Sequence, residues 1–411
     1  MKYGCIGEHL KHSFSKEIHN ALCDYEYEIV EVEREKLGDF AILGDFIAIN
    51  VTIPYKEMIM PYMYYIDEHA REIGAVNTVV NRDGRLYGYN TDFFGMSMLL
   101  SHAGVKVNGK KVVILGTGGT AKTSYAVVRA LGAREIIRVS REAKDGAVTY
   151  CELYESHTDA DVIINTTPVG MFPRIFDTPV DISKFERLSG VIDAVYNPLR
   201  TELITEAKRR GIAAEGGLYM LVAQAVRASE IFIDKKYDET EIERVYKKTL
   251  SDKENIVLIG MPASGKSTVG AILKDKLGRE LIDTDALIVK KAGMSIPEIF
   301  EKRGEEVFRE IECEVIKEIA DRTECIIATG GGAVLSEKNV DQLKKNGRLF
   351  FIDRPLNALV PTEDRPLALD REAIKKRYDE RYGIYTSCAD FTIDADCQAD
   401  EVADKILKEF I

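Results

Sequence analysis

Histidine is missing from the C-terminal part of this 411-residue sequence, because all six histidines lie at or before His157. A metal site or an acid/base group beyond that point must therefore use carboxylates, lysine, arginine or the backbone. Cysteine is sparse as well, since the seven residues form no C-x-x-C pair and have no regular spacing. That pattern is typical of neither a disulfide framework nor a zinc ribbon, so we expect reduced thiols.

Long apolar runs and an excess of basic residues are also absent. No run approaches the ~20 residues that a membrane span needs, and the net charge of −12 disfavours a nucleic-acid backbone as a partner. The N-terminus, MKYGCIG, has no signal or transit pattern, so we expect a cytoplasmic protein. The composition, 45% hydrophobic and 30% charged, is that of a globular protein, and small molecules remain as its expected partners.

Short apolar runs rich in β-branched residues alternate with helical segments along the chain. This βαβ rhythm predicts an α/β fold with parallel sheets. At about 100–200 residues per domain, the length predicts two to four domains. Charged residues dominate 234–255, which we expect to form a helix end plus a linker, and we place the boundary between two series of strands near residue 250. The expected strands are 46–49, 112–115, 135–139, 162–164, 191–194 and, in the second series, 256–259.

The stretch NIVLIGMPASGKSTVG contains G-x-x-x-x-G-K-S between an apolar strand and a predicted helix, 269–277. Backbone N–H groups of such a loop cradle phosphates, while Lys266 reaches the β and γ oxygens and the Ser267 hydroxyl ligates Mg²⁺. The alternative is a glycine-rich turn with an exposed lysine. We therefore predict a nucleoside-triphosphate site with Mg²⁺, whose nucleotide contacts are Ala263, Ser264, Gly265, Lys266, Ser267 and Thr268.

The first acidic pair after this loop is Asp283-Thr284-Asp285, at the end of the short strand 280–282. Motor ATPases and GTPases need an apolar strand that ends in Asp, but strand 325–328 runs into Thr329. Asp283 is a candidate for the Mg²⁺ shell, and Asp285 is a candidate to accept a proton from an acceptor hydroxyl. This arrangement favours a small-molecule kinase.

Several further motifs make residues 256–411 similar to shikimate kinase. They are Gly304-Glu305-x-x-Phe308-Arg309-x-x-Glu312, Gly330-Gly331-Gly332, Arg365-Pro366-Leu367, and Arg381 with Tyr385. The resemblance implies that Arg309 and Arg381 hold the shikimate carboxylate, since bidentate arginine suits a carboxylate. It also implies that Asp285 contacts the ring hydroxyls, that Gly331 and Gly332 line the substrate site, and that Arg365 contacts the ATP phosphates.

Structural alternatives exist for the single kinase residues. Arg309 and Glu312 have the spacing of an ordinary helical ion pair, and Arg381 alone is compatible with a solvated side chain. The sequence departs from the family in its lid, which is compact and lacks an arginine upstream of Arg365 to stack on adenine.

In the N-terminal part, KVVILGTGGTA places G-x-G-x-x-A after a strand and before a helix. Such a turn can hold a dinucleotide pyrophosphate, although a tight βα turn without a ligand is the alternative. The next strand ends in Ser140-Arg141 rather than in an acidic residue, which favours the 2′-phosphate of NADP over NAD. A solvated Arg141 is the other interpretation.

Two loops nearer the N-terminus supply the candidate reacting groups. NVTIPYK ends in Lys56 and GYNTDFFG contains Asp92. An ammonium beside a carboxylate can protonate the alkoxide that forms when hydride reaches a ketone. The alternatives are a surface lysine and an N-cap for the helix 93–101.

Residues 2–233 resemble shikimate dehydrogenase, because HSFSKEIHN, NVTIPYK, GAVNTV, GYNTDFFG, TPVGM, DAVYNP and GGLYMLVAQA occur in that family's order. Lys16, where the family has proline, and Ser140-Arg141-Glu142, where it commonly has Asn-Arg-Thr, are departures. The resemblance implies Lys56 as acid/base and substrate contacts at Ser13, Ser15, Thr52, Asn77, Asp92, Tyr196 and Gln224. It implies NADP contacts at Gly116, Gly118, Gly119, Ala121, Ser140, Arg141 and Gly217.

The two resemblances together predict a bifunctional enzyme that reduces 3-dehydroshikimate with NADPH and phosphorylates the resulting shikimate with MgATP. The expected domains are a substrate domain (1–102), a Rossmann-like NADP domain whose last helix returns to the first (103–233), a charged linker (234–254) and a P-loop kinase domain (255–411). Two alternatives stay open: the first part could be a ligand-sensing module, and the second a nucleotide-gated structural domain.

Overall fold

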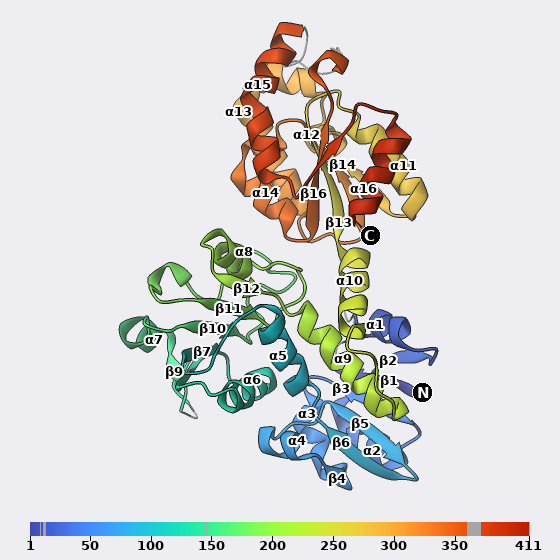
Figure 1. The fold of residues 1–411 in the computed structure, drawn as a ribbon, viewed down its shortest axis with the longest axis vertical. Coiled ribbons are helices and arrows are strands. Elements are labelled where there is room, and N and C mark those ends of the chain that lie inside the picture. Colours follow the sequence, from blue (N-terminus) through green and yellow to red (C-terminus); the bar gives the residue numbers. More distant parts are fainter. Residues whose placement is uncertain (9, 11–13, 145, 360–370, 411) are drawn as a thin grey trace. The chain divides into compact units, whose positions relative to one another are not determined.

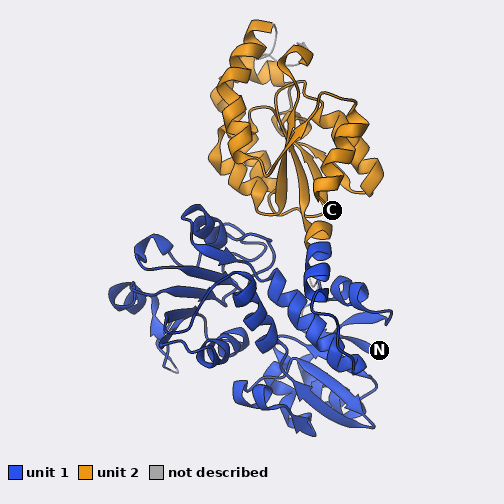
Figure 2. Cartoon of the chain, in the orientation of Figure 1, with its two compact units in different colours: residues 1–249 blue, residues 250–411 orange. Residues whose placement is uncertain are grey.

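The computed structural model describes residues 1–8, 10, 14–144, 146–359 and 371–410. The chain divides into two compact units, Met1–Thr249 and Leu250–Ile411 (Figures 1 and 2). No described helix combines the length and apolarity that crossing a bilayer requires. All seven cysteines are free thiols, which confirms the expectation of no disulfide framework.

The first sheet of unit 1 has the strand order β2-β1-β3-β5-β6-β4. Strands β1, β2 and β3 are parallel, whereas β5 runs antiparallel to β3 and to β6. Asp83 and Gly84 join β5 to β6 with positive φ at both positions, as a two-residue type I′ hairpin requires. The elements are β1 (Tyr3–Gly7), α1 (Ser15–Leu22), β2 (Tyr27–Glu31), η1 (Arg34–Lys36), α2 (Leu37–Leu43), β3 (Ala48–Val51), α3 (Tyr55–Met58), η2 (Met60–Tyr62), β4 (Tyr65–Ile66), α4 (Glu68–Ile73), β5 (Thr78–Arg82), β6 (Arg85–Tyr89) and α5 (Asp92–His102).

The second sheet of unit 1 is parallel throughout, in the order β12-β11-β10-β7-β8-β9. Strands β7, β10 and β11 are buried along their whole length, as expected for a parallel sheet with both faces covered. The elements are β7 (Lys111–Leu115), α6 (Gly119–Ala130), β8 (Glu135–Ser140), β9 (Val148–Thr149), α7 (Tyr150–Ser156), β10 (Val162–Asn165), η3 (Ile182–Lys184), β11 (Gly190–Asp193), α8 (Glu202–Arg209), β12 (Ala213–Glu215) and α9 (Leu218–Ile233).

Helices α5 and α9 pack against each other between the two sheets of unit 1 (Figure 1). Helix α9 follows the second sheet, yet it also contacts α1, β3 and β5 of the first. Most of its side chains are buried, which explains why the segment is apolar on nearly every face. It is the helix that we expected to return to the first domain.

The charged segment 234–254 differs from the expected linker, because Glu241–Lys253 form the helix α10. Ile242 and Val245 are buried, and Tyr246 packs edge-on against Tyr219 of α9, with ring centroids 5.0 Å apart. These three apolar positions at helical spacing are outnumbered by charged residues, which is why composition alone indicated a linker. The boundary between the units falls within α10, after Thr249.

Unit 2 contains one parallel sheet in the order β14-β15-β13-β16-β17. Alternate residues of β13 enter two different cores: Val257 and Ile259 face one side, and Ile256 and Leu258 face the other. The elements are β13 (Asn255–Ile259), α11 (Lys266–Leu277), β14 (Glu280–Asp283), α12 (Thr284–Ala292), α13 (Ile296–Ile319), β15 (Cys325–Ala328), η4 (Ala333–Leu335), α14 (Glu337–Lys344), β16 (Gly347–Asp353), η5 (Leu356–Ala358), α15 (Arg371–Cys388), β17 (Phe391–Asp394) and α16 (Ala399–Phe410).

Helix α13 is broken at Gly304, whose φ of 83° and ψ of 170° are not helical. Glycine adopts a positive φ without the steric cost that a side chain brings. The break separates the start of the helix from the part that carries Arg309 and Glu312.

Candidate active sites

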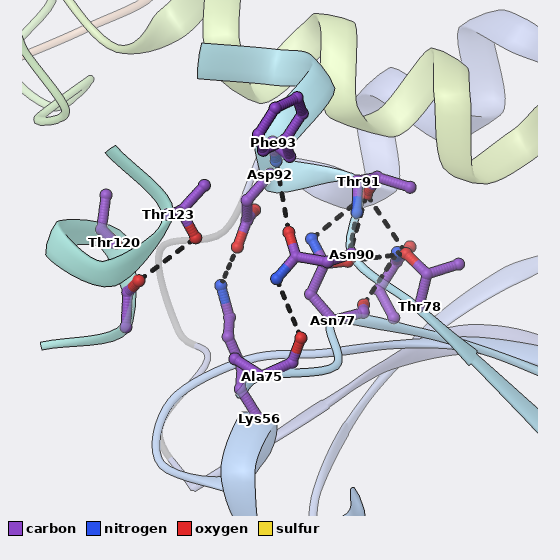
Figure 3. A network of polar contacts seen from close by, with 12 residues as sticks. Lys56, Ala75, Asn77, Thr78, Asn90, Thr91, Asp92, Phe93, Thr120 and Thr123 are labelled. Carbon is purple, nitrogen blue, oxygen red and sulfur yellow. Dashed lines mark hydrogen bonds and ion pairs between the residues drawn. The ribbon is translucent and has the colours of Figure 1, made fainter. Parts of the chain in front are cut away.

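The structure brings Lys56 and Asp92 together in unit 1, where Lys56 Nζ lies 2.7 Å from Asp92 Oδ2 (Figure 3). Lys56 belongs to the short helix α3, and Asp92 is the first residue of α5. Only 16% of the lysine and 4% of the aspartate side chain are exposed. The surface-lysine alternative is therefore wrong. The helix-cap alternative for Asp92 also fails, because Asn90 Oδ1 accepts the Phe93 N–H instead.

A buried polar network holds the segment that precedes Asp92 (Figure 3). Asn77 Oδ1 accepts from the Thr91 N–H at 2.8 Å, and Asn77 Nδ2 donates to Thr91 Oγ1 at 3.1 Å. Thr78 Oγ1 donates to Asn77 Oδ1 at 3.0 Å, and Asn90 Nδ2 donates to the Ala75 carbonyl. These bonds fix the start of α5 against β5, so they also fix the position of the Asp92 carboxylate.

Two further predicted substrate residues, Gln224 and Tyr196, carry buried polar groups. Gln224 lies on α9, and its Oε1 is buried with no hydrogen-bond partner in the part of the chain that the structure describes. A buried acceptor without a partner is costly, so a ligand donor fits there. Tyr196 packs edge-on against Phe14 at 5.2 Å, and burial raises the pKa of its phenol to about 12. Tyr196 is therefore a neutral hydrogen-bonding group at pH 7.

The remaining predicted substrate residues lie in the first half of unit 1. Thr52 directly follows β3 and is partly buried, and Ser15 is the first residue of α1. Ser13 lies outside the described residues.

The glycine-rich turn between β7 and α6 has room for a ligand. Gly116 has a φ of 112°, and a Cβ there would lie 2.7 Å from Thr166 Oγ1. In contrast, nothing lies within 4 Å of a Cβ built at Gly118 or Gly119, where α6 begins. Open space beside a helix N-terminus fits a dinucleotide pyrophosphate. Ala121, in the first turn of α6, is buried.

Ser140 ends β8, which pairs in parallel with β7, so Ser140 and Arg141 lie at the same sheet edge as the glycine turn. Arg141 is exposed, and its position is compatible both with a 2′-phosphate contact and with a solvated side chain. At Gly217, a Cβ would lie 2.2 Å from the Ala194 carbonyl oxygen, so any side chain is excluded there.

The glycine turn is also connected to the Lys56–Asp92 pair. Helix α6 packs against α5, the helix that begins with Asp92. In addition, Lys122 of α6 forms an ion pair of 2.6 Å with Glu57, the residue after Lys56. The elements that carry the groups predicted for cofactor binding and for proton transfer are therefore in contact.

In unit 2, the phosphate-binding loop joins β13 to α11. Lys266 is buried and donates to the carbonyls of Gly260 at 2.9 Å and Met261 at 2.8 Å. The alternative of a turn with an exposed lysine is therefore wrong. Ala263 and Gly265 have positive φ values of 63° and 94°, which curl the loop between strand and helix. Ser264 is buried, and Ser267 and Thr268 lie in the first turn of α11.

Ser267 and Asp283 meet where a magnesium ion is predicted. Ser267 Oγ donates to Asp283 Oδ2 at 2.9 Å, while Asp283 Oδ1 caps α12 by accepting from the Asp285 and Ala286 N–H groups. No group of three or more His, Cys, Asp or Glu side chains that could hold a metal occurs among the described residues. A hydroxyl plus one carboxylate oxygen fits Mg²⁺, which keeps water and phosphate as its other ligands.

Gly330, Gly331 and Gly332, which we call the glycine wall, lie close to Asp285, Arg309 and Pro262 of the predicted kinase site. A Cβ at Gly330 would lie 2.6 Å from Asp285 Oδ1, and one at Gly332 would lie 2.1 Å from an Arg309 nitrogen. A Cβ at Gly331 would lie 2.7 Å from Pro262 in the phosphate-binding loop. A side chain at any of these positions would require a neighbour to shift, so Asp285, Arg309 and the phosphate-binding loop all lie close to the glycine wall.

Arg309 and Arg381 both reach this wall. Arg309 pairs with Glu312 at 2.8 Å and with Glu305 at 3.1 Å, so the expected helical ion pair is present. Arg381 is buried, with 6% of its surface exposed, and donates to the Gly331 carbonyl at 3.1 Å. The solvated alternative for Arg381 is therefore wrong.

Comparison with known proteins assigns the families. The family model for the shikimate dehydrogenase substrate binding domain matches residues 5–79. A shikimate dehydrogenase (NADP(+)) from Clostridium beijerinckii is 37% identical over 259 residues, which are 59% of this chain and 96% of that relative. The chain belongs to the shikimate dehydrogenase family. A second family model, for shikimate kinase, matches residues 262–410.

Solved structures of shikimate dehydrogenases resemble the N-terminal unit. Shikimate dehydrogenase 1 from Peptoclostridium difficile has a TM-score of 0.56 and 37% identity, and the match covers 61% of this chain and 98% of that one. A chorismate mutase/shikimate 5-dehydrogenase fusion from Clostridium acetobutylicum has a TM-score of 0.57 and 35% identity, with 60% and 96% covered. This family is therefore also found fused to a second enzyme.

The chain is a bifunctional enzyme of the shikimate pathway, with an NADP-dependent shikimate dehydrogenase unit and an ATP-dependent shikimate kinase unit. Its α/β fold with parallel sheets agrees with the expectation from the sequence. Arg365 of the kinase lid lies outside the described residues.

Sequence reasoning assigned no role to several groups at the two sites of this bifunctional shikimate enzyme. Thr78 and Thr91 anchor Asn77, although both lie in stretches that carried the resemblance. Glu312 is buried, its Oε1 has no hydrogen-bond partner among the described residues, and burial raises the pKa of its carboxyl. The burial of Glu312 depends on packing, so no local pattern in the sequence indicates it.

Proposed function

We propose that Lys56 and Asp92 perform the proton transfer in the reduction of 3-dehydroshikimate to shikimate. NADPH, which the open turn at Gly118 and Gly119 fits, supplies the hydride. The Lys56 ammonium gives a proton to the carbonyl oxygen as the alkoxide forms, and Asp92 orients that ammonium. The observation that carries this proposal is the 2.7 Å contact between the two buried side chains.

Hydrogen-bonding side chains around this pair would bind the substrate hydroxyls and carboxylate. The unpartnered Oε1 of Gln224 and the neutral phenol of Tyr196 support that part of the proposal. Ser13, Ser15, Thr52 and Asn77 complete the proposed substrate set. We assign the dinucleotide to Gly116, Gly118, Gly119, Ala121, Ser140, Arg141 and Gly217, with Arg141 at the 2′-phosphate.

In the kinase unit, Asp285 would accept the proton of the shikimate 3-hydroxyl. The oxygen of that hydroxyl would attack the γ-phosphorus of ATP, and the bond between the γ-phosphorus and ADP would break. Ser267 and Asp283 would hold Mg²⁺, and Lys266 would leave its loop carbonyls to bind phosphate oxygens. Arg309 and Arg381, both at the glycine wall, would hold the shikimate carboxylate. Arg365 would bind the ATP phosphates.

We further propose the domain bounds 1–102, 103–233 and 255–411, a cytoplasmic location, and small molecules rather than nucleic acid as partners. The product of the first unit is then the substrate of the second.

Two assays on the full chain test the proposal against its alternatives. NADPH oxidation that depends on 3-dehydroshikimate supports an enzyme in unit 1, whereas tight binding without oxidation indicates a sensing module. ADP release that increases with shikimate supports the kinase, whereas release that does not respond to shikimate indicates a nucleotide-gated structural domain.

A further inference from the structure

Two polar side chains, Asn165 and Asp193, are fully buried at the ends of neighbouring strands in the second sheet of unit 1. They are register partners on β10 and β11, and Asn165 Nδ2 donates to Asp193 Oδ1 at 2.9 Å. Among the described residues, hydrogen-bond donors and no cation offset the burial of the Asp193 carboxyl. Because apolar residues often replace buried charged groups without loss of stability, this pair points to a role beyond stability.

Asn165 holds the loop that follows β10. Its Oδ1 accepts from the Thr167 N–H at 3.0 Å and from the Thr167 hydroxyl at 2.7 Å. The preceding residue, Thr166, donates from its N–H and from its hydroxyl to the Leu115 carbonyl at the end of β7, at 3.0 and 2.6 Å. A Cβ at Gly116 would lie 2.7 Å from that hydroxyl oxygen. The loop fixed by Asn165 therefore borders the glycine-rich turn.

Asp193 holds the loop that follows β11. Its Oδ1 also accepts from the Val195 N–H at 3.0 Å, and the Val195 carbonyl accepts from the Gly217 N–H at 2.9 Å. Its Oδ2 accepts from the hydroxyl of Thr201, the N-cap of α8, at 2.7 Å. One carboxyl group thus joins three segments, because it also binds Asn165.

We propose that Asn165 and Asp193 are positioning residues for NADPH, which set the two loops that border its site. The proposal rests on the proposed assignment of the dinucleotide to the glycine-rich turn and Gly217. Strands β10 and β11 run parallel to β7, so their ends lie at the same sheet edge as that turn. Neither side chain is exposed, so both act through the residues they hold: Thr167 on one side and Val195 with Gly217 on the other.

The alternative is that the pair only stabilises unit 1. Thr201 distinguishes the two cases, because its buried hydroxyl binds the same carboxyl group but belongs to the start of α8. If the role is stability alone, removing the Asn165 amide and removing the Thr201 hydroxyl should both lower the melting temperature and leave KM for NADPH unchanged.

The test measures NADPH oxidation by the full chain at saturating 3-dehydroshikimate. Asn165→Leu should raise KM for NADPH roughly tenfold, the scale of one buried hydrogen bond, with kcat within about threefold of wild type. Asn165→Ala, which removes the amide without adding bulk, carries the same expectation. A retained kcat shows that unit 1 is folded in each variant.

Thr201→Val is the matched control, because it removes one buried hydrogen bond to Asp193 and keeps the shape of the side chain. It should lower the melting temperature and leave KM for NADPH within about twofold of wild type. Asp193→Leu should raise that KM as Asn165→Leu does. Asp193→Asn should restore it, since the amide oxygen can accept from Asn165 and Val195 while the amide nitrogen donates to Thr201.

An unchanged KM for NADPH in the Asn165 variants, or an equal rise in Thr201→Val, would overturn the proposal. Gly118→Val tests the underlying assignment separately, because its side chain would fill the open space beside the start of α6. If Gly118→Val leaves KM for NADPH unchanged, the proposed dinucleotide site itself is wrong.

Discussion

In the dehydrogenase unit, Lys56 and Asp92 are bonded to each other, whereas in the kinase unit Lys266 and Ser267 are bonded to groups that ligands would replace. The first pair is held by packing and by the network around Asn77, so its geometry is complete in the protein alone. Lys266 instead donates to two carbonyls of its own loop. The comparison teaches that the fold alone sets the geometry of the pair proposed for proton transfer, whereas the groups proposed for phosphoryl transfer would have to exchange hydrogen bonds when nucleotide binds.

We expect the largest effect from a substitution that breaks the pair of Lys56 and Asp92. Lys56→Met should lower kcat for NADPH oxidation by about 10²–10⁴-fold, because general acid catalysis by the ammonium is lost. Shikimate-dependent ADP release should be unchanged, since the residue belongs to the other unit. The matched control is Lys36→Met, an exposed lysine in the same domain. A loss below tenfold would show that Lys56 does not transfer the proton.

The corresponding change in the kinase unit is Asp285→Asn. It should lower kcat for phosphorylation by about 10²-fold, because the amide cannot accept the hydroxyl proton. NADPH oxidation should not change. Asp275→Asn, at an exposed position of α11, is the control. If Asp285→Asn raises only KM for shikimate, then Asp285 binds the substrate but is not the base.

The next prediction concerns the preference of the dehydrogenase unit for NADPH over NADH. Arg141→Ser should raise KM for NADPH roughly tenfold, the size of one charge-assisted contact, and leave KM for NADH unchanged. Arg134, which is exposed just before the other end of β8, provides the control Arg134→Ser. Equal changes for both dinucleotides would mean that Arg141 does not contact the 2′-phosphate.

The last prediction concerns stability rather than activity, at Asp193, which ends β11 and is fully buried. Burial raises its pKa to about 7, although Thr201, Val195 and Asn165 donate hydrogen bonds to it. Between about pH 4 and pH 7, the folded chain then binds one proton more than the unfolded chain. The free energy of unfolding therefore falls as pH rises through this window, by at most about 4 kcal/mol.

Asp193→Asn removes this titration while keeping the shape of the protonated acid. Calorimetric unfolding should give similar melting temperatures for variant and wild type near pH 4, and the variant should become relatively more stable toward pH 8. Asp177→Asn, an exposed position in the preceding loop, should show no such trend. A constant difference from pH 4 to pH 8 would contradict the buried titration.

Features encoded by a contiguous motif could be predicted from the sequence. The loop at Lys266 and the segments of Lys56 and Asp92 have their geometry set by a strand, a turn and a helix start that lie together in the chain. The charged side of α10 conceals a short apolar stripe at Ile242 and Val245, so the sequence indicated only a helix end and a linker where a full helix forms. Charge and composition describe a segment's surface better than its buried face.

Features that arise from distant segments could not be predicted. The Oε1 atom of Glu312 has no hydrogen-bond partner among the described residues. Its surroundings are formed by Asp285, Gly330 and Arg381, which come from three other parts of unit 2. The sequence shows Glu312, Asp285 and Arg381 as ordinary charged positions on helices, and only packing distinguishes them.

The coupled reaction tests the central claim most directly. The full chain is incubated with 3-dehydroshikimate, NADPH, ATP and Mg²⁺, and the products are identified by mass. We predict shikimate 3-phosphate, with one NADPH oxidised and one ADP released for each molecule formed. Shikimate that accumulates without phosphorylation would contradict the kinase assignment, and unreacted 3-dehydroshikimate with unoxidised NADPH would contradict the dehydrogenase assignment.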